Sequence, residues 1–255
     1  MNRNKRRLKR IISSVPPTSD QDFDFVIVGG GSAGCALAAR LAQDPTSKVL
    51  LIEAGNPALK DPRINVPALF GAIQRTNLDW QYETTTAKET RERVHFWPRG
   101  KALCGCSSIN AMLYVRGNKE DFNEWESKHG CKGWSFNKIL PYFLKSEGCL
   151  VDPADVDASH APGTRALEED IVRSREYVEE HVRRDSYTVY HPVGTCRMGL
   201  KGPDTVVGHT DLKVHGFANL RVADASIMPE ITSGNTNAPC IMIGEVCADM
   251  IHGMF

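Results

Sequence analysis

Between residues 23 and 52, apolar segments alternate with segments rich in small residues, and this pattern predicts the first elements. Residues 23–28 form a mostly apolar run that ends in glycines, which predicts a buried strand. Residues 33–42 are rich in Ala and Leu and predict a helix, which ends before Asp44-Pro45. Residues 48–52 predict a second buried strand. A strand, a helix and a strand in this order predict a βαβ unit with two parallel strands, typical of an α/β fold.

The remainder of the chain is less regular and predicts shorter elements. Residues 55–101 are rich in Pro, Asn and Thr and have little periodicity, so we expect long loops with short elements there. Apolar residues recur at helical spacing in the charged segment that follows the middle of the chain: Leu167, Ile171, Val178 and Val182. The later elements that we expect are a turn running into a helix over 104–112, helices over 121–127, 136–145, 164–185 and 240–251, and a strand over 219–222.

Composition and charge exclude several classes of protein. Hydrophobic residues make up 41% of the 255 residues and charged residues 24%, which is ordinary for a globular protein. The 31 basic and 31 acidic residues cancel, so the net charge gives no field that attracts nucleic acid. We therefore expect no nucleic-acid partner. No apolar run is long enough for a transmembrane helix, so we expect no membrane span either.

Cysteines and the N-terminal charges bear on the compartment. The chain has eight cysteines and no Cys-x-x-Cys pair, so we expect a reducing, intracellular compartment, without a disulfide framework or a metal site. Residues 1–20 are strongly basic, with no acidic residue before Asp20. This segment is either a disordered basic tail or a mitochondrial presequence. The protein is then cytoplasmic or mitochondrial.

A glycine motif lies between the first predicted strand and the first predicted helix. Gly29, Gly31 and Gly34 fit G-x-G-x-x-G, and the strand before them and the helix after them are the context that gives this motif its meaning. Each glycine has a physical purpose: a tight turn, a close approach to a pyrophosphate, and close packing of helix on strand. The motif predicts a dinucleotide phosphate site at the helix N-terminus.

An acidic residue follows the motif at the distance expected for a ribose-binding group. Glu53 lies 19 residues after Gly34, at the end of the second predicted strand. A carboxylate there accepts hydrogen bonds from the hydroxyls of an adenosine ribose. It would repel a 2′-phosphate, so we expect a dinucleotide without one. The βαβ unit alone does not distinguish FAD from NAD.

Several stretches of the chain resemble the glucose-methanol-choline (GMC) oxidoreductases, and details near residues 235–239 are most similar to their choline dehydrogenase-like branch. One stretch is similar to the first signature of the family, whose Gly- and Ser-rich loop meets the flavin. The stretches that carry the resemblance are 25–34, 51–55, 79–82, 99–117, 191–199, 220–229 and 233–239. It implies an FAD-binding, Rossmann-like domain.

The resemblance also implies the residues that hold FAD. Ile109 stands where some relatives attach the flavin through a His, so the resemblance implies non-covalent FAD. Cys104 stands where a glycine is usual and Cys106 where a Ser, Thr or Gly is usual. A side chain at Cys104 is expected to lie near a tight turn and to weaken flavin binding. The implied cofactor-binding residues are Gly29, Gly31, Ser32, Ala33, Gly34, Glu53, Arg99, Gly100, Gly105, Ser107, Asn110, Ala111, Asp224 and Ala225.

The C-terminal stretches imply a catalytic pair. His191 matches the histidine that takes the proton of the alcohol in the family, and Asn237 matches the partner of this base. Oxidation of an alcohol removes a hydride, which the flavin accepts, and a proton, which a neutral imidazole accepts. The implied partner is a small-molecule alcohol. The electron acceptor stays open.

The resemblance covers the two ends of a longer family chain. We expect a basic tail over 1–20, the first part of the FAD domain over 21–148, a linker over 149–163 in place of a missing section, and the second part over 164–255. Most of the substrate domain is then missing. Two alternatives therefore stay open: a catalytically inactive FAD-binding remnant, and an NAD-dependent dehydrogenase. The signature loop and the His191 segment argue against the second.

Overall fold

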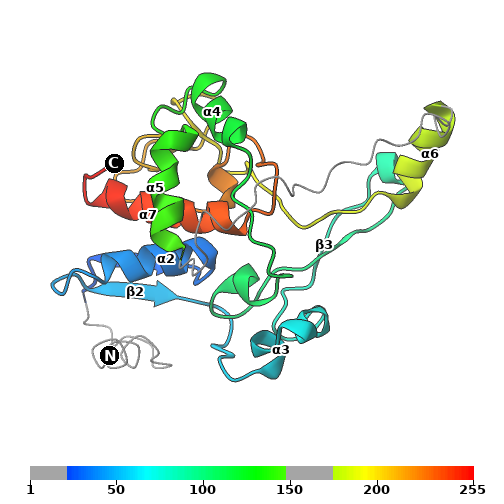
Figure 1. Cartoon of the computed structure of the whole chain (residues 1–255), viewed down its shortest axis with the longest axis horizontal. Coiled ribbons are helices and arrows are strands. Elements are labelled where there is room, and N and C mark those ends of the chain that lie inside the picture. Colours follow the sequence, from blue (N-terminus) through cyan, green and yellow to red (C-terminus); the bar gives the residue numbers. More distant parts are fainter. Residues whose placement is uncertain (1–21, 148–174) are drawn as a thin grey trace, which may run out of the picture.

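The computed structural model describes residues 22–147 and 175–255 (Figure 1). The expected βαβ unit is confirmed, since strand β1 (Phe25–Val28), helix α2 (Ser32–Leu41) and strand β2 (Val49–Ile52) follow one another. The two strands are parallel, with Phe25 opposite Val49 and Val28 opposite Ile52. The pair forms a two-stranded sheet.

Helix α7 (Asn237–Ile251) lies at the centre of the core, against α2 on one side and α5 (Phe136–Ser146) on the other (Figure 1). Its approach to α2 depends on Gly244, because a Cβ there would lie 2.4 Å from the carbonyl oxygen of Ala33. The apolar residues of the core come from both ends of the chain. Its largest fully buried side chains include Trp125, Trp134, Phe122, Phe143, Ile139, Met242 and Met198.

A buried ion pair joins the same three helices. Glu245 in α7 is 3% exposed, and its Oε2 lies 2.5 Å from Nε of Arg40 in α2 and 3.7 Å from Nζ of Lys145 in α5. The two cations compensate for the removal of this carboxylate from water. The apolar pattern of α7 does not indicate that Glu245 is buried or which cations pair with it.

The short helix α4 (Lys119–Ser127) packs on α5 and begins at a capping box. The Asn118 side chain accepts a hydrogen bond from the N–H of Glu120, and Asp121 Oδ2 accepts one from the N–H of Asn118, at 2.8 Å. These bonds satisfy amides that have no partner inside the helix. Helices α4, α5 and α7 confirm the three helices that were expected over 121–127, 136–145 and 240–251.

Residues 55–101 form loops with short elements, as expected. They contain α3 (Pro62–Asn65), two 3₁₀ turns (Pro67–Ala72 and Lys88–Thr90) and an antiparallel pair of β3 (Tyr82–Glu83) with β4 (Phe96–Trp97). The β3–β4 pair extends away from the helices towards α6 (Arg175–Asp185) (Figure 1). Further along the chain, β5 (Met198–Gly199) pairs with β6 (Val207–Gly208).

The prediction that β1 and β2 are buried strands is wrong for one face of the sheet. Ile27 packs against α2 and is buried, whereas Val26 and Val28 are 56% and 81% exposed and Ile52 is 45% exposed. In the described part of the chain, α2 covers one face and nothing covers the other (Figure 1). The apolar sequence is suited to a sheet that is buried on both faces.

Two other expectations need correction. The turn at Cys104 leads only into a 3₁₀ turn over Gly105–Ser108, because Met112 has a φ of 61° and the Asn110 side chain accepts its N–H. In place of a strand over 219–222 there is a single bridge between Arg221 and Lys213.

The helix expected over 164–185 is described only from Arg175 to Asp185, so Leu167, Ile171 and the linker over 149–163 lie outside the described residues, as does the basic tail over 1–20. Val178 and Val182 of the expected apolar stripe are 49% and 54% exposed. Helix α6 contacts the turn at 88–90, where Arg91 pairs with Glu180.

Candidate active site

The loop between β1 and α2 has the backbone geometry of a phosphate-binding turn. Gly29 has a φ of 97°, which disfavours any other residue. A Cβ on Gly34 would lie 2.0 Å from the carbonyl oxygen of Gly29, so only glycine fits there. A Cβ on Gly31, in contrast, would meet no atom within 4 Å. The loop is therefore closed behind Gly34 and open in front of Gly31.

The N-terminus of α2 faces this open space without a side-chain cap. Gly31 is the N-cap residue, and the first turn contains no acidic residue. The first amides of a helix have no partner within it and carry partial positive charge. Ser32, Ala33 and Gly34 provide these amides. An anionic group in front of Gly31 is therefore matched in charge and hydrogen bonding.

The carboxylate of Glu53 is bound to the backbone on both sides of the loop. Its Oε2 accepts the N–H of Gly30 at 2.7 Å, and its Oε1 accepts the N–H of Gly55 at 2.8 Å. The side chain is half-buried. A carboxylate has about four lone-pair sites, so each oxygen retains capacity for a hydroxyl donor. The structure thus gives Glu53 a role in shaping the loop that the sequence did not indicate.

The signature loop packs directly against the glycine loop. A Cβ on Gly105 would lie 2.9 Å from Cα of Gly31, and one on Gly100 would lie 2.2 Å from the carbonyl oxygen of Gly105. The N–H of Cys104 donates to the carbonyl of Gly30 at 2.6 Å. Cys104 has a φ of 73°, which confirms that this non-glycine residue occupies a tight left-handed turn.

Three polar side chains from three separate segments meet at this junction. Oδ1 of Asn237, at the start of α7, accepts hydrogen bonds from Ser32 at 3.0 Å and from Ser107 at 2.7 Å. The two hydroxyl oxygens lie 2.6 Å apart. Asn237 therefore ties the C-terminal helix to both loops that the sequence assigned to cofactor binding.

His191 is held by the two residues that precede Asn237. Its Nε2 lies 3.0 Å from Nδ2 of Asn235, and its Nδ1 lies 3.1 Å from Oγ1 of Thr236. An amide nitrogen only donates, so Nε2 accepts and Nδ1 carries the proton, which it donates to Thr236. Burial, and then the charge of Arg99, lower the pKa of His191 below its usual 6.5. Both effects favour the neutral imidazole, the form that acts as a base.

The expected contact between His191 and Asn237 is not the one that the structure has. The amide at His191 is that of Asn235, while Asn237 is bound to Ser32 and Ser107. The three consecutive residues 235–237 thus connect the histidine to the glycine loop. Asn235 and Thr236 lie within a stretch that the sequence analysis singled out, but it assigned the partner role to the third residue.

Arg99 lies beside His191. Its Nη2 donates to the carbonyl of Tyr190 at 2.8 Å, and its own N–H donates to Asp79 Oδ1 at 3.0 Å. Asp79 is 3% exposed and also accepts the N–H groups of Arg75 and Gln81. The sequence implied a cofactor-binding role for Arg99, and the structure places it where it positions the histidine segment. Asp79, which organises this loop, was not among the predicted site residues.

The remaining predicted cofactor-binding residues make local contacts within their own segments. Asn110 accepts the N–H of Met112 at 2.7 Å, and Ala111 is exposed in the same extended segment. Asp224 is exposed and caps a 3₁₀ turn over Ala225–Ile227 by accepting the N–H of Ser226 at 2.8 Å.

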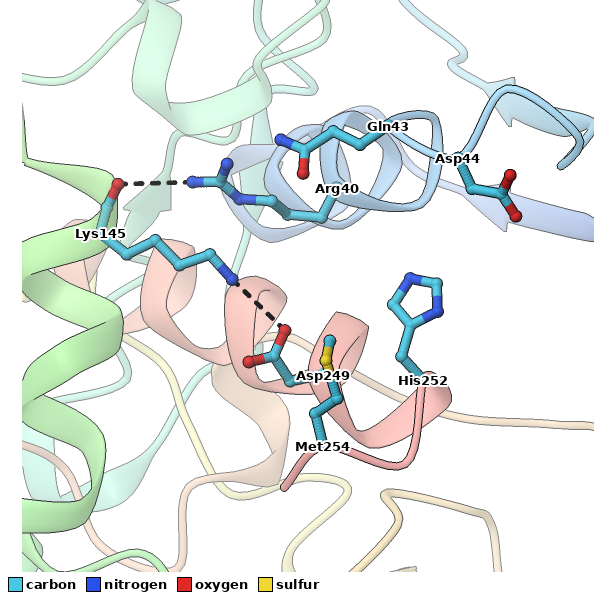
Figure 2. A pocket seen from close by; sticks show the side chains of 7 residues that line it. All are labelled: Arg40, Gln43, Asp44, Lys145, Asp249, His252 and Met254. Atoms are coloured by element: carbon cyan, nitrogen blue, oxygen red, sulfur yellow. Dashed lines mark hydrogen bonds and ion pairs between the residues drawn. The ribbon is translucent and has the colours of Figure 1, made fainter.

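A separate hollow of about 310 Å³ lies at the other end of α2, as Figure 2 shows. It is lined by Arg40, Gln43, Asp44, Lys145, Asp249, His252 and Met254. The Arg40 guanidinium donates to the carbonyl of Lys145 at 3.3 Å, and Nζ of Lys145 lies 3.3 Å from Asp249 (Figure 2). These contacts hold α2, α5 and α7 together, and the hollow shares no residue with the site at Gly31 and His191.

The residues at the glycine loop fit a dinucleotide such as FAD. The open space before Gly31 and the uncapped N-terminus of α2 suit a pyrophosphate. Glu53 retains acceptor capacity at the end of β2, where a ribose is bound in such folds. The close approach of Gly105 to Gly31 brings the second loop to the same place.

Two protein families match separate parts of the chain. A family described as GMC oxidoreductase matches residues 144–244. A family described as lycopene cyclase protein matches residues 24–75, which contain the βαβ unit.

Curated relatives match about half of the chain. The chain is 40% identical to a glucose dehydrogenase [FAD, quinone] of Drosophila pseudoobscura over 148 residues, 56% of this chain and 23% of the relative. It is 40% identical to the mitochondrial choline dehydrogenase of Homo sapiens over 146 residues, 54% of this chain and 24% of the relative. The matched part therefore spans about a quarter of these relatives. At 255 residues the chain is partial, since its relatives have about 550.

Solved structures agree on the fold. A pyridoxine 4-oxidase from Mesorbium loti superposes with a TM-score of 0.75 over 91% of this chain and 99% of that chain, at 20% identity. A formate oxidase from Aspergillus oryzae, studied for modification of its FAD, gives a TM-score of 0.51 and 38% identity over 56% of this chain and 25% of that chain. The expected FAD-binding fold is thus confirmed.

Proposed function

We propose that the chain is a GMC oxidoreductase, the family whose model matches residues 144–244, and that it oxidises a small-molecule alcohol to a carbonyl compound, with His191 as the base and non-covalent FAD as the hydride acceptor. One observation carries the proposal. Residues 235–237 bind His191 with their first two side chains and the glycine-loop junction with the third. The base and the nucleotide site are therefore parts of one rigid arrangement.

We assign the cofactor to the loops that meet at Gly31. The amides of Ser32, Ala33 and Gly34 would bind the pyrophosphate, and Glu53 would accept from the ribose hydroxyls. The loop from Gly100 to Ser107 would lie against the flavin. Ile109 offers no nucleophile for a covalent bond, which supports non-covalent binding.

The chemistry divides between the cofactor and the protein. FAD held by these loops would supply the acceptor for the hydride of the alcohol carbon. His191 accepts the hydroxyl proton at Nε2, because Nδ1 already carries a proton that it donates to Thr236. The nearby charge of Arg99 disfavours the imidazolium, so the histidine stays neutral and ready to accept.

Asn235 has two roles in this proposal. In the structure its amide occupies the lone pair of Nε2 at 3.0 Å, so an alcohol must displace this hydrogen bond before it transfers its proton. Once displaced, the amide N–H is a donor beside the oxygen that loses the proton. It would there stabilise the developing alkoxide.

One observation favours a second candidate, an inactive remnant that binds FAD. The outer face of the β1–β2 sheet exposes Val26, Val28 and Ile52, and the chain has about half the length of its relatives. Catalysis of this kind needs a closed pocket that excludes water. The alternative of an NAD-dependent dehydrogenase agrees less well with the sequence, because it leaves the signature loop and His191 without a role.

The experiment that tests the proposal is anaerobic reduction of the purified protein by a panel of alcohols. We expect a yellow protein whose absorbance bleaches on addition of a substrate alcohol, and whose FAD is released by acid precipitation. A bound flavin that dithionite reduces but no alcohol reduces would favour the remnant. A colourless protein that binds NAD would contradict the FAD assignment.

We propose an intracellular location, either cytoplasmic or mitochondrial. Two relatives are named as mitochondrial choline dehydrogenases, from Homo sapiens and Mus musculus. The basic residues 1–20 are compatible with an intracellular, cytoplasmic or mitochondrial protein. Within residues 22–147 and 175–255, no helix has the length and apolar character that a bilayer crossing requires.

A further inference from the structure

Two cysteines meet at the carbonyl of Gly30, in the middle of the glycine loop, one through its thiol and the other through its backbone N–H. Sγ of Cys35, in the first turn of α2, donates to this carbonyl at 3.1 Å. The N–H of Cys104 donates to the same oxygen at 2.6 Å. The two side chains also interact with each other. They come from positions 69 residues apart in the sequence, and the Gly30 carbonyl accepts from the thiol of Cys35 and from the backbone of Cys104.

The electrostatics of the two thiols are asymmetric. The interaction with the Cys35 side chain, followed by that with Ser108, lowers the pKa of Cys104 to about 6 against the opposing effect of burial. The same interaction between the two cysteines, together with burial, raises the pKa of Cys35 well above its usual value. A thiolate, not a thiol, is the nucleophile of cysteine chemistry. Cys104 is therefore the attacking member and Cys35 the resolving member.

Both thiols are also accessible. Each is only partly buried, whereas Cys131 and Cys247 are fully buried in the core. Cys106, two residues from Cys104, has different neighbours, since its Sγ accepts the N–H of Gly100 at 3.5 Å. The pair of Cys35 and Cys104 is thus the one that contacts the glycine loop at Gly30.

We propose that Cys35 and Cys104 are a reversible oxidation site, which a hydroperoxide converts to a disulfide that joins the signature loop to the first turn of α2. Neither the family resemblance nor the proposed alcohol oxidation requires this pair. The inference rests on the Gly30 carbonyl, which accepts from the Cys35 thiol and from the Cys104 backbone, and on the interaction between the two side chains, and it is independent of the proposed function.

The reaction balances in two steps. The Cys104 thiolate attacks the peroxide, the O–O bond breaks, and the products are a sulfenic acid on Cys104 and an alcohol, or water from hydrogen peroxide. Cys35 then attacks the sulfenic sulfur, and water leaves with the Cys35 proton. Two electrons pass from the two sulfurs to the peroxide. A dithiol reductant reverses the change.

The disulfide would alter the junction that surrounds the nucleotide loop. Cys104 precedes Gly105, which lies against Gly31, and Cys35 follows Gly34, which lies against Gly29. A covalent link between them fixes the distance between the two walls of the candidate cofactor site. We therefore expect oxidation to slow the exchange of any bound dinucleotide.

The test is peptide mapping of the full 255-residue chain after treatment with stoichiometric hydrogen peroxide under non-denaturing conditions. Alkylation traps the remaining thiols, and mass spectrometry without reduction identifies the linked peptides. We expect a Cys35–Cys104 cross-link that disappears on reduction, together with the loss of one pair of titratable thiols. The Cys106→Ser variant is the matched control and should form the same cross-link.

Two variants make the result decisive. Cys35→Ser should give no cross-link, and its Cys104 should be trapped as a sulfenic acid by dimedone. Cys104→Gly, which suits the φ of 73° at this position, should also give no cross-link. A cross-link between Cys35 and Cys106, or sulfinic acid on Cys104 of the unmodified chain without any cross-link, would overturn the proposal.

Discussion

Nδ2 of Asn235 lies 3.0 Å from Nε2 of His191, the nitrogen that a base would use. The histidine is therefore the neutral tautomer with its proton on Nδ1, and the lone pair of Nε2 already accepts a hydrogen bond from the amide. The amide is thus both an obstacle to the alcohol and a donor for its oxygen. This relationship makes Asn235 the most informative position for separating the two effects.

We expect Asn235→Asp to raise the pKa of His191. A carboxylate beside Nε2 stabilises the imidazolium, in opposition to burial and to the charge of Arg99. NMR titration of ¹⁵N-labelled protein would follow the ring nitrogens, with His191→Gln to assign the signal and His252, at the far end of α7, as an internal control. An unchanged His191 titration in Asn235→Asp would show that residue 235 does not contact the ring in solution.

The rate of flavin reduction should rise with pH and reach its plateau at a lower pH than expected for a histidine with a pKa of 6.5. Only the neutral imidazole accepts a proton, and burial together with Arg99 lowers the pKa of His191, so the neutral form persists to a pH below 6.5. His191→Ala should reduce the rate by roughly 10²–10⁴-fold and remove the pH dependence. Anaerobic stopped-flow bleaching measures both, and equal flavin content in the two proteins is the control. Similar rates in both would exclude His191 as the base.

Two glycines of the same loop should respond differently to substitution. Gly31→Trp should keep the fold and abolish FAD binding, because the space in front of Gly31 is open but lies where a pyrophosphate would bind. Gly34→Ala should destabilise the chain by roughly 1–3 kcal/mol, because its Cβ would lie 2.0 Å from the Gly29 carbonyl. Urea unfolding and flavin titration of both variants distinguish the effects. Stoichiometric FAD in Gly31→Trp would refute the nucleotide site.

Glu53→Ala should weaken FAD binding by about 1.5–3 kcal/mol, the range for hydrogen bonds to a charged group. The structure adds a second expectation, a modest loss of stability, because Gly30 and Gly55 lose their acceptor. Isothermal titration with FAD and thermal unfolding measure the two effects. Glu83→Ala, at an exposed position in β3, is a suitable control. An unaltered affinity would show that Glu53 only supports the loop.

Alkylation by iodoacetamide should single out Cys104. Its pKa is lowered to about 6, so its rate should rise with pH to half its maximum near pH 6. Burial raises the pKa of Cys131 and of Cys247 to about 11, so these thiols should react slowly at neutral pH. In Cys35→Ala the midpoint for Cys104 should move up towards the ordinary value of about 8.5, because the thiol donor is lost. The same midpoint in both proteins would contradict the shared hydrogen bond.

The regular parts of the fold could be predicted because their signals are local. The glycine motif and the apolar runs around it locate β1, α2 and β2 within two residues, and the helix expected over 240–251 is α7 with three more residues at its start. The buried Glu245 within that helix could not be predicted, because its partners Arg40 and Lys145 come from other helices.

The structure brings several of the predicted site residues together, but not all through the expected contacts. His191 and Asn237 were identified, yet which of three consecutive polar residues faces the imidazole depends on where α7 begins, and it begins at Asn237. The exposure of Val28 could not be predicted either. An apolar strand favours burial on both faces, but the sequence does not show whether a second layer packs on it.

The contact of Gly244 with Ala33 joins positions 211 residues apart in the sequence. Because the first and last helices of the described core share this interface, the two ends of the chain meet at one backbone contact. Any side chain at 244 would have to displace the first turn of α2 at Ala33, which also forms the start of the glycine-loop helix. The packing of the C-terminal helix is thus mechanically coupled to the loop that begins at Gly29.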